Sequence, residues 1–479
     1  MGYPVIIQGG MGVGVSSWQL ARSVSQAGHL GVVSGTALDN VLARRLQDGD
    51  QGGNIRRALR HFPNQEMAQR TLDRFLKIDG RDEAEPYTVA AKLTIRPNSA
   101  TQELSIVANF VEVWLAKEGH SGIVGINYLE KIQMATPSAA YGAMLAGVDY
   151  ILMGAGIPAL IPKLLNDLSI HKLCNLKIDV AGATKEYHSI FDPKLIMGEL
   201  LPPLKRPIFL AIISSHILAS YLNRDDLTKP DGFILESSTA GGHNAPPRDL
   251  KNTSESNELI YGPRDEIDLE KVAKTGLPYW LAGGRSTPNQ LKDAISKGAV
   301  GIQVGTLFSL AQESGYTNVI RNEIISELKS GHASIKTDGA ASPTGFPFKV
   351  LELEGSISNA DIYADRSRLC DLGYLRTPYE RAPGVLGYRC AGEPVDVYIK
   401  KGGNKDEAEY RKCLCNSLMA NIGIGQERGD GYLEPTLITV GSDLVGVNEM
   451  SSRHPHGWSA FDLIEYLEGY EVTVIHFEI

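Results

Sequence analysis

The chain has 479 residues, a formal net charge of −9 and a hydrophobic fraction of 43%. This composition is typical of a soluble globular protein and excludes a disordered, collagen-like or coiled-coil chain. The acidic balance leaves no electrostatic footprint for nucleic acid, and the lack of an 18-residue apolar run argues against a membrane span. Residues 1–8 lack a signal-peptide pattern. We therefore expect a cytoplasmic protein that acts on a small molecule, with a homo-oligomer as one alternative for its assembly.

Eight short apolar runs follow one another along the first 300 residues. They are hydrophobic almost throughout, which is typical of strands buried on both faces of a parallel sheet. Helical periodicity separates most of them, as at Ser17–Ala27, Leu104–Lys117 and Pro288–Lys297. This alternation predicts an α/β fold, a (β/α)8 TIM barrel. Two further apolar segments, Ala90–Ile95 and Leu176–Val180, leave the strand count open. The eight runs are Pro4–Gln8, Gly31–Ser34, Gly122–Asn127, Asp149–Met153, Ile208–Ile213, Gly232–Glu236, Tyr279–Ala282 and Gly301–Val304.

Two stretches interrupt the alternation and one region ends it. Residues 40–85 have a helical pattern, and residues 155–207 are longer than a loop of this fold needs, so both are predicted to be insertions. Beyond about residue 340 the strand–helix alternation stops, and Pro, Gly, Tyr and Cys become more frequent. The sequence therefore predicts a barrel domain over residues 1–340. A smaller, irregular and partly helical extension over residues 341–479 is expected to pack on it.

Glycine-rich turns follow four of the predicted strands. They contain Gly9 and Gly10, then Gly241 and Gly242, then Gly283 and Gly284, and finally Gly305 with Thr306. In a barrel all strand carboxyl ends lie on one face, and the turns after the last two strands commonly bind phosphate there. Any one of these turns alone is better explained as a tight turn, whereas the turns after the last two strands together favour phosphate binding. The glycine spacing after Gln8 does not match the dinucleotide fingerprint, so a phosphate-anchored mononucleotide is favoured.

With these motifs the chain resembles the nitronate monooxygenase (2-nitropropane dioxygenase) family of FMN-dependent barrel enzymes. That family also includes flavin-dependent enoyl-acyl carrier protein reductases, NADH:quinone reductases and reductase subunits of polyunsaturated fatty acid synthases. The resemblance covers about residues 4–315. Its segments are PVIIQGGM (4–11), AGHLGVVSG (27–35), GIN (125–127), AGGH (240–243), AGG (282–284) and GAVGIQVGTLF (298–308).

The resemblance implies FMN as the cofactor and a role for each motif residue. Gln8 and Met11, with the two glycines between them, would line the isoalloxazine ring, and Asn127 would hold the ribityl chain or the phosphate. His243 would be the acid–base residue facing the flavin, a task that suits a group titrating near neutrality. The remaining cofactor contacts would be backbone positions at the turns: Gly241, Gly242, Gly283, Gly284, Gly305 and Thr306.

Three functions fit this resemblance. The first is oxidation of alkyl nitronates with O2, with His243 as the base. The second is NAD(P)H-dependent reduction of an enoyl thioester or a quinone on the same flavin. The third is a partner subunit of a biosynthetic complex that has retained FMN. The chain also departs from the family: the lysine often found after the fifth strand is missing, with His216 nearby, and Arg248 follows the histidine motif. These departures leave the substrate and the electron donor open.

Four of the five cysteines lie in the extension, at Cys370, Cys390, Cys413 and Cys415. Zinc and iron–sulfur sites usually show C-x2-C spacing, whereas this region has one C-x-C pair and two single cysteines. We therefore expect free thiols and no metal site, with a shared metal as the alternative.

Overall fold

The computed structural model describes residues 2–82, 85–198, 201–249, 258–429 and 431–469. Eight parallel strands form its central barrel, in the order β1-β11-β10-β8-β7-β4-β3-β2. They are β1 (Ile6–Gln8), β2 (Gly31–Ser34), β3 (Val124–Leu129), β4 (Tyr150–Gly154), β7 (Ile208–Ile213), β8 (Gly232–Glu236), β10 (Tyr279–Ala282) and β11 (Gly301–Val304). A parallel bridge between Ile7 and Leu30 brings the first and last strands of this order together. The predicted TIM barrel is confirmed, and its strands are the eight apolar runs.

The strands are apolar throughout because both of their faces are buried. One set of side chains fills the barrel interior, where the Trp280 indole N–H donates to the Pro4 carbonyl at 2.7 Å. The neighbouring set faces the surrounding helices, which explains why the sequence does not alternate. The interior set includes Ile7, Val32, Leu152, Leu210, Ile234 and Trp280, and the outer set includes Ile6, Val33, Ile151, Phe209, Phe233 and Leu281.

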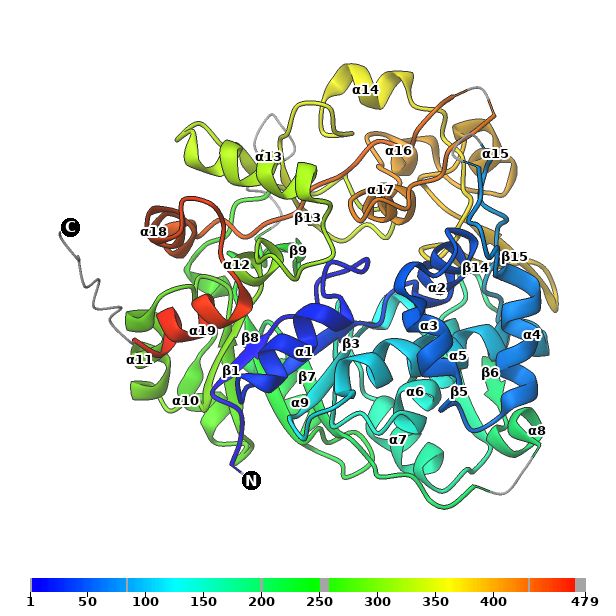
Figure 1. Cartoon of the computed structure of the whole chain (residues 1–479), viewed down its shortest axis with the longest axis horizontal. Helices are drawn as coiled ribbons and strands as arrows, with labels where there is room; N and C mark the ends of the chain where they lie inside the picture. The colour runs from blue at the N-terminus through cyan, green and yellow to red at the C-terminus, as the bar shows by residue number, and fades with distance from the viewer. Residues whose placement is uncertain (1, 83–84, 199–200, 250–257, 430, 470–479) are drawn as a thin grey trace.

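Helices cover the outside of the barrel between consecutive strands (Figure 1). The three helices named from the sequence are confirmed as α1 (Trp18–Gln26), α5 (Ser99–Lys117) and α11 (Pro288–Ser296). Each begins at a polar side chain that accepts a hydrogen bond from the first turn, namely Ser17, Asn98 and Thr287, as helix N-termini require. The others around the barrel are α6 (Thr136–Leu145), α9 (His216–Leu222) and α10 (Leu269–Ala273), while α12 (Thr306–Ser309) and α13 (Asn318–Lys329) follow the last strand, β11.

Both predicted insertions contain secondary structure of their own. The first is helical, as expected, and forms α2 (Leu38–Gln47), α3 (Asn54–Leu59) and α4 (Gln65–Phe75). The second contains α7 (Ile161–Ser169), the antiparallel pair β5 (Cys174–Ile178) and β6 (Tyr187–Phe191), and α8 (Pro193–Met197). The candidate strand at Leu176–Val180 therefore belongs partly to a hairpin outside the barrel. Ala90–Ile95 forms no strand.

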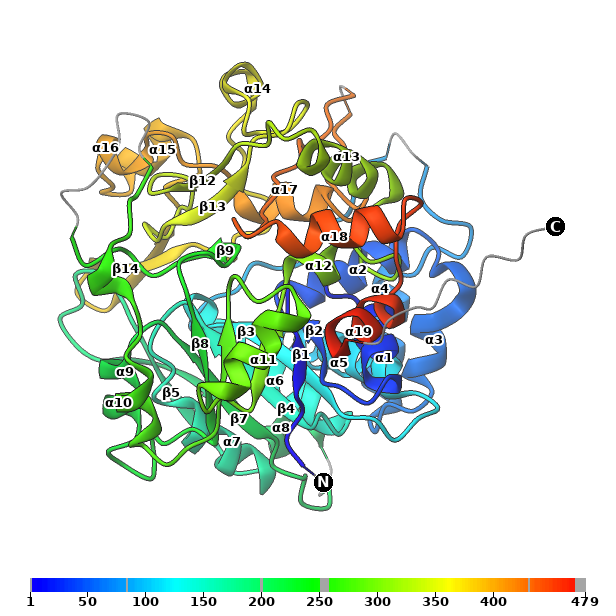
Figure 2. The same cartoon turned by 90° about the vertical axis from the view of Figure 1, so that its left-hand side faces the viewer.

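Most of the carboxyl-terminal region lies over the barrel on the side away from the N-terminus, whereas its last helix packs beside α1 and α11 on the flank of the barrel (Figure 2). A small sheet begins the region, in which β13 (Phe348–Leu351) pairs on one side with β12 (Ile335–Asp338) and on the other with β9 (Gly242–His243), which follows β8. This small sheet straddles residue 340, and the division there remains a prediction. The other elements are α14 (Ala360–Asp365), β14 (Thr377–Ala382), β15 (Val385–Arg389), α15 (Val395–Lys400), α16 (Lys405–Ala408), α17 (Leu414–Ala420), α18 (Val445–Arg453) and α19 (Ala460–Glu468).

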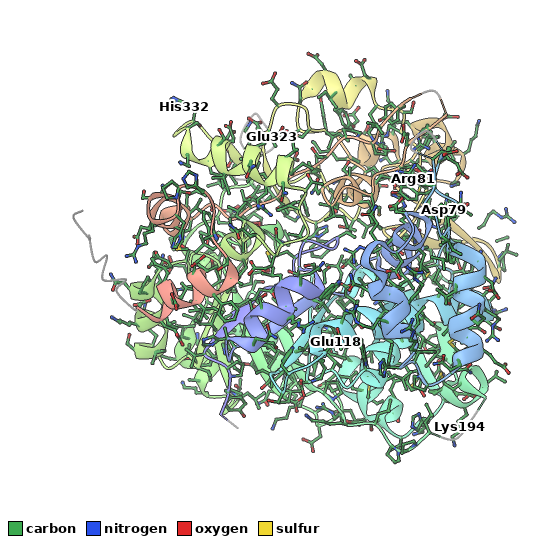
Figure 3. The ribbon with its side chains drawn as sticks, viewed as in Figure 1. Asp79, Arg81, Glu118, Lys194, Glu323 and His332 are labelled. Carbon is green, nitrogen blue, oxygen red and sulfur yellow. The ribbon has the colours of Figure 1, made fainter. Side chains whose placement is uncertain are left out.

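Many polar and charged side chains lie on the outside, among them Lys194, Glu323 and His332, which Figure 3 labels and which are exposed. Within the part of the chain that the structure describes, no helix combines the length and the apolar character needed to cross a bilayer.

Candidate active site

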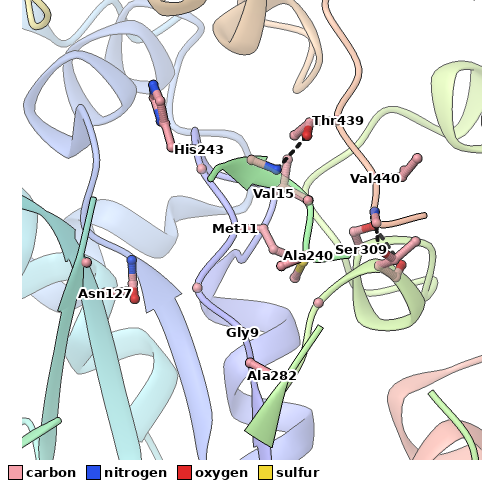
Figure 4. A pocket seen from close by; sticks show the side chains of 18 of the residues that line it. Gly9, Met11, Val15, Asn127, Ala240, His243, Ala282, Ser309, Thr439 and Val440 are labelled. Carbon is pink, nitrogen blue, oxygen red and sulfur yellow. Dashed lines mark hydrogen bonds between the residues drawn. The ribbon is translucent and has the colours of Figure 1, made fainter. Parts of the chain in front are cut away.

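A cavity of about 250 Å³ opens at the carboxyl end of the barrel. In the view of Figure 4, the Gly9–Met11 segment crosses its middle, with Asn127 and His243 on one side and Val440 on the other. The four glycine-rich turns therefore converge, although they are spread over about 300 residues. The motif residues that line the cavity are Gly9, Gly10, Met11, Asn127, Gly241, Gly242, His243, Gly283, Gly284, Gly305 and Thr306.

Gln8 is the one motif residue outside this lining. Its side chain is fully buried, where Oε1 accepts from the Val32 N–H at 2.9 Å and Nε2 donates to the Ser16 hydroxyl at 2.8 Å. The amide thus joins β1 to β2 at the closure of the barrel. The structure places the Gln8 side chain in the core, whereas the resemblance implied a position beside the flavin ring.

Glycine occupies these positions of the site for two different physical reasons. At Gly10 a Cβ would lie 2.2 Å from the Asn127 Cβ, and at Gly241 it would lie 2.9 Å from the Val440 carbonyl carbon. Both glycines therefore allow close packing of two chain segments. Gly305 is different, because a Cβ there would meet nothing closer than the Met11 sulfur at 3.8 Å. Its missing side chain leaves space in the cavity itself.

The extension supplies much of the cavity wall. The Thr439 hydroxyl oxygen accepts from the Gly242 N–H at 2.7 Å, and the Gly441 N–H donates to the Thr306 hydroxyl oxygen at 2.8 Å, as Figure 4 shows. The segment 439–443 is thereby fastened to two of the four turns. The extension residues in the lining are Phe348, Tyr374, Leu375, Leu414, Cys415, Leu418, Thr439, Val440, Gly441, Asp443 and Val447. No sequence motif marks them.

His243 lies where the motif placed it, at the cavity wall. Its Nε2 lies 2.8 Å from the Ser342 hydroxyl, and its ring packs edge-on against Phe348, with the ring centroids 4.9 Å apart. Burial, reinforced by the positive charge of Lys131, lowers the pKa of His243 to about 4. The imidazole is therefore neutral at physiological pH, and one of its nitrogens is engaged by the extension.

Glu236 is a functional candidate that the sequence analysis missed. It is the last residue of β8 and lines the cavity. Burial raises the pKa of its carboxyl group to about 7, and the nearby positive charge of Lys349 opposes this shift. The only available signal was its position as an acidic residue at the carboxyl end of a barrel strand, where catalytic residues occur in this fold.

An acidic residue also stands at the turns predicted to bind phosphate. The Asp443 carboxylate accepts from the Gln290 side-chain N–H at 3.0 Å and from the Ser286 hydroxyl at 3.2 Å. A Cβ on Gly284 would lie 3.8 Å from this carboxylate. Arg285 also lines the cavity, with its guanidinium bound to Asp293 at 2.9 Å. The turns predicted to bind phosphate thus offer backbone N–H groups and one cation, which the Asp443 carboxylate opposes.

Part of the cavity lining suits a flat heteroaromatic ring. Gln303, at the carboxyl end of β11, lines the cavity, and its buried Oε1 has no hydrogen-bond partner among the described residues. A buried acceptor without a donor costs about 1–3 kcal/mol, and an imide N–H of an isoalloxazine ring would supply that donor. Apolar side chains such as Met11, Val13 and Ile132 line the same cavity. The residues present fit a flavin ring.

The remaining sequence candidates lie elsewhere. Neither His216 nor Arg248 lines the cavity; His216 begins α9, and Arg248 is exposed. All five cysteines are free thiols, and Cys390 and Cys413 are buried. Over the described ranges of the chain, no group of three or more His, Cys, Asp or Glu side chains is arranged to hold a metal ion.

Comparison with known proteins gives no match to a protein-family model and none to a curated protein. Among solved structures, the chain is similar to FabK from Thermotoga maritima, with a TM-score of 0.47, 15% identity and coverage of 97% of this chain and 91% of that chain. It is also similar to nitroalkane oxidase from Streptomyces ansochromogenes, with a TM-score of 0.44, 15% identity and coverage of 97% of this chain and 94% of that chain. A third similar structure is the enoyl reductase domain of MlnA from the macrolactin biosynthesis cluster of Bacillus amyloliquefaciens. Its TM-score is 0.45 at 11% identity, and the match covers 97% of this chain and 93% of that chain. Likenesses this weak carry no conclusion about function, which rests on the residues of the cavity.

Proposed function

We propose that the chain is an FMN-dependent oxidoreductase of the nitronate monooxygenase type, which oxidises alkyl nitronates with O2. One observation carries this proposal: four glycine-rich strand ends, a neutral histidine and an unpartnered amide oxygen converge on one cavity at the carboxyl end of the barrel. The carboxyl end is where enzymes of this fold carry out their chemistry. The nitronate is a small anion with a short apolar tail, which suits a partly apolar cavity.

The residues that would hold FMN divide into two groups. Gln303 Oε1 and the segment from Gly9 to Met11 would face the ring, because that oxygen lacks a donor among the described residues and Gly9 lies beside the Gln303 side chain. The turns at Gly283–Gly284 and Gly305–Thr306, with Arg285, would hold the phosphate through backbone N–H groups and one positive charge. Asn127 would contribute a side-chain amide to the polar chain between them.

When bound, the flavin would supply the redox chemistry by accepting electrons from the substrate and returning them to O2. The protein contributes position and proton handling. His243 is neutral at physiological pH because its pKa is lowered to about 4, so its ring offers one N–H donor and one acceptor. Through this ring it would orient the nitronate oxygens and take up a proton released during turnover. The Ser342 contact would fix the ring orientation.

A reductase of enoyl thioesters is the second candidate, and one observation favours it. The extension adds the apolar side chains of Leu375, Leu414 and Leu418 to the cavity wall. A short alkyl nitronate needs little of this apolar surface, whereas an acyl chain would use it. In that reaction the flavin would be reduced by NAD(P)H.

Anaerobic mixing separates the two candidates. Propyl-2-nitronate, NADH and NADPH are added in separate experiments to the FMN-loaded protein, and the loss of visible flavin absorption is followed. The proposal predicts bleaching by the nitronate. Bleaching by a nicotinamide alone would contradict it and favour the reductase. The His243→Asn variant should retain FMN and lose at least tenfold in turnover; unchanged turnover would remove His243 from the mechanism.

A further inference from the structure

We propose that Tyr374 is the end wall of a tail subsite, which limits the length of the alkyl chain that a nitronate can place in the cavity. This inference rests on the proposed function and deepens it, because it names unbranched nitronates with a tail of limited length as the substrate class. It concerns the apolar end of the substrate and assigns Tyr374 no part in the chemical step.

An apolar surface connects His243 to Tyr374. Phe348 packs edge-on against the His243 ring, and it belongs to the same buried cluster as Ile132, Leu414 and Tyr374. All of these residues line the cavity. A nitronate whose oxygens are held at His243 would therefore have apolar neighbours for its alkyl chain, and burying the chain against them is favourable. The other apolar cavity residues that belong to this cluster or pack against it include Val13, Ala37, Leu129, Leu375 and Leu418.

Tyr374 stands between this cavity and a smaller one. It lines both of them, and the smaller cavity, of about 20 Å³, has room for roughly one water molecule. Leu375 and Leu414 line the main cavity but not the smaller one, whereas Asp39 and Asn109 line the smaller cavity but not the main one. The ring of Tyr374 is therefore part of the partition. The other residues shared by the two cavities are Thr36, Ala37, Tyr128, Leu129 and Ile132.

Hydrogen bonds at the phenol hydroxyl hold the Tyr374 ring in place. The hydroxyl donates to the Asp39 carboxylate and accepts from the Asn40 side-chain N–H at 2.7 Å. Both partners lie in the first turn of α2, whereas Tyr374 belongs to the extension and is 4% exposed. Rotating the ring out of the partition would leave the buried Asp39 carboxylate without this donor, which is costly in a protein interior. An entering alkyl chain therefore meets a fixed wall.

The space behind Tyr374 does not suit an apolar chain. Its walls include Asp39, Asn109 and Thr136, and the Asn109 side-chain oxygen accepts from the Tyr128 hydroxyl at 3.0 Å. An alkyl chain offers no hydrogen bond to such a wall. The length limit thus has two causes, the ring itself and the polar space behind it.

The test uses straight-chain carboxylates, because a carboxylate is a planar two-oxygen anion like a nitronate and does not reduce a flavin. Calorimetry on the FMN-loaded protein measures the dissociation constant of each acid from acetate to decanoate. In the wild type we expect about fourfold tighter binding for each added methylene, until the chain reaches Tyr374 and the gain stops. The length at which it stops should increase by about two methylenes in Tyr374→Leu, which vacates ring space. It should remain unchanged in Tyr374→Phe, which keeps the ring.

Ile132→Ala opens the same partition without removing a hydrogen bond, and it should also increase the length limit. Its matched control is Ile324→Ala, which removes the same atoms from a buried site outside the cavity and should leave the limit unchanged. Nitronates with the same tails should show the same limit in KM, with kcat changed by less than about threefold, because the tail contributes binding that is equal in the ground state and the transition state.

The outcomes separate Tyr374 from the proposed function. Binding that strengthens through the whole series, that does not depend on chain length, or that stops at the same length in Tyr374→Leu and Ile132→Ala would overturn the role of Tyr374. A limit that moves in Tyr374→Phe would also overturn it. Bleaching of the wild-type flavin by nitronates together with any of these results would leave the proposed function intact. If no nitronate bleaches the flavin, the proposed function fails, and this inference fails with it.

Discussion

Replacing Gly305 by valine tests whether the cavity is a cofactor site. Gly305 has a negative φ of −103°, so its backbone is not in the left-handed region that favours glycine, and the nearest atom to an added Cβ is the Met11 sulfur at 3.8 Å. The folded chain therefore has room for the new side chain, and we expect the free energy of unfolding to change by no more than about 0.5 kcal/mol. The three added carbons would occupy cavity space that a bound flavin needs.

The size of the effect follows from overpacking. Forcing extra methyl groups into a filled site costs about 1–3 kcal/mol, which corresponds to roughly 5- to 150-fold weaker FMN binding. The dissociation constant is measured by quenching of FMN fluorescence. Gly262→Val is the matched control, because a Cβ there also meets open space but lies outside the cavity. Unchanged FMN affinity in a folded Gly305→Val protein would refute the placement of the cofactor.

Three further predictions concern charges. Asp443→Asn should tighten FMN binding roughly two- to fivefold in the same titration, because it removes about 0.5–1 kcal/mol of repulsion at the turns predicted to bind phosphate; weaker binding would contradict this. Glu434→Ala should lower the free energy of unfolding in urea by about 3–5 kcal/mol, because the guanidinium of Arg366, 2% exposed and paired at 2.9 Å, loses its partner; a loss below 1 kcal/mol would refute it. The native pKa of His243, about 4, lies below its ordinary value of 6.5, so the unfolded chain binds the extra proton. The wild type should therefore lose stability relative to His243→Gln as the pH falls from 6.5 to 4, and parallel profiles would exclude this linkage.

The barrel was predictable because its strands and turns are each marked by a short, continuous stretch of sequence. Each strand is a short run buried on both faces, and the glycine turns stand directly at the strand ends. The shared direction of parallel strands then brings Gly9, Gly241, Gly283 and Gly305 to one face without any knowledge of the loops. For the same reason most of the motif residues line one cavity.

The rest of the site depends on contacts between distant segments. The Gln8 side chain points into the core because its amide forms hydrogen bonds with the Ser16 hydroxyl and the Val32 N–H. No local sequence pattern predicts this orientation. The segment carrying Thr439 and Asp443 reaches the turns from the far end of the chain, with no motif to mark it. Glu236 was read as part of a buried strand, because an apolar run does not reveal that its last side chain faces a cavity.

The most direct test of the central claim is the binding of FMN to the purified chain. The absorption spectrum between about 300 and 600 nm is recorded before and after the addition of FMN, and free cofactor is removed by dialysis. We expect one FMN retained per chain, with a flavin spectrum shifted from that of free FMN, because the ring is transferred from water to a partly apolar cavity. A correctly folded chain that retains no FMN would contradict the claim that this cavity is a flavin site.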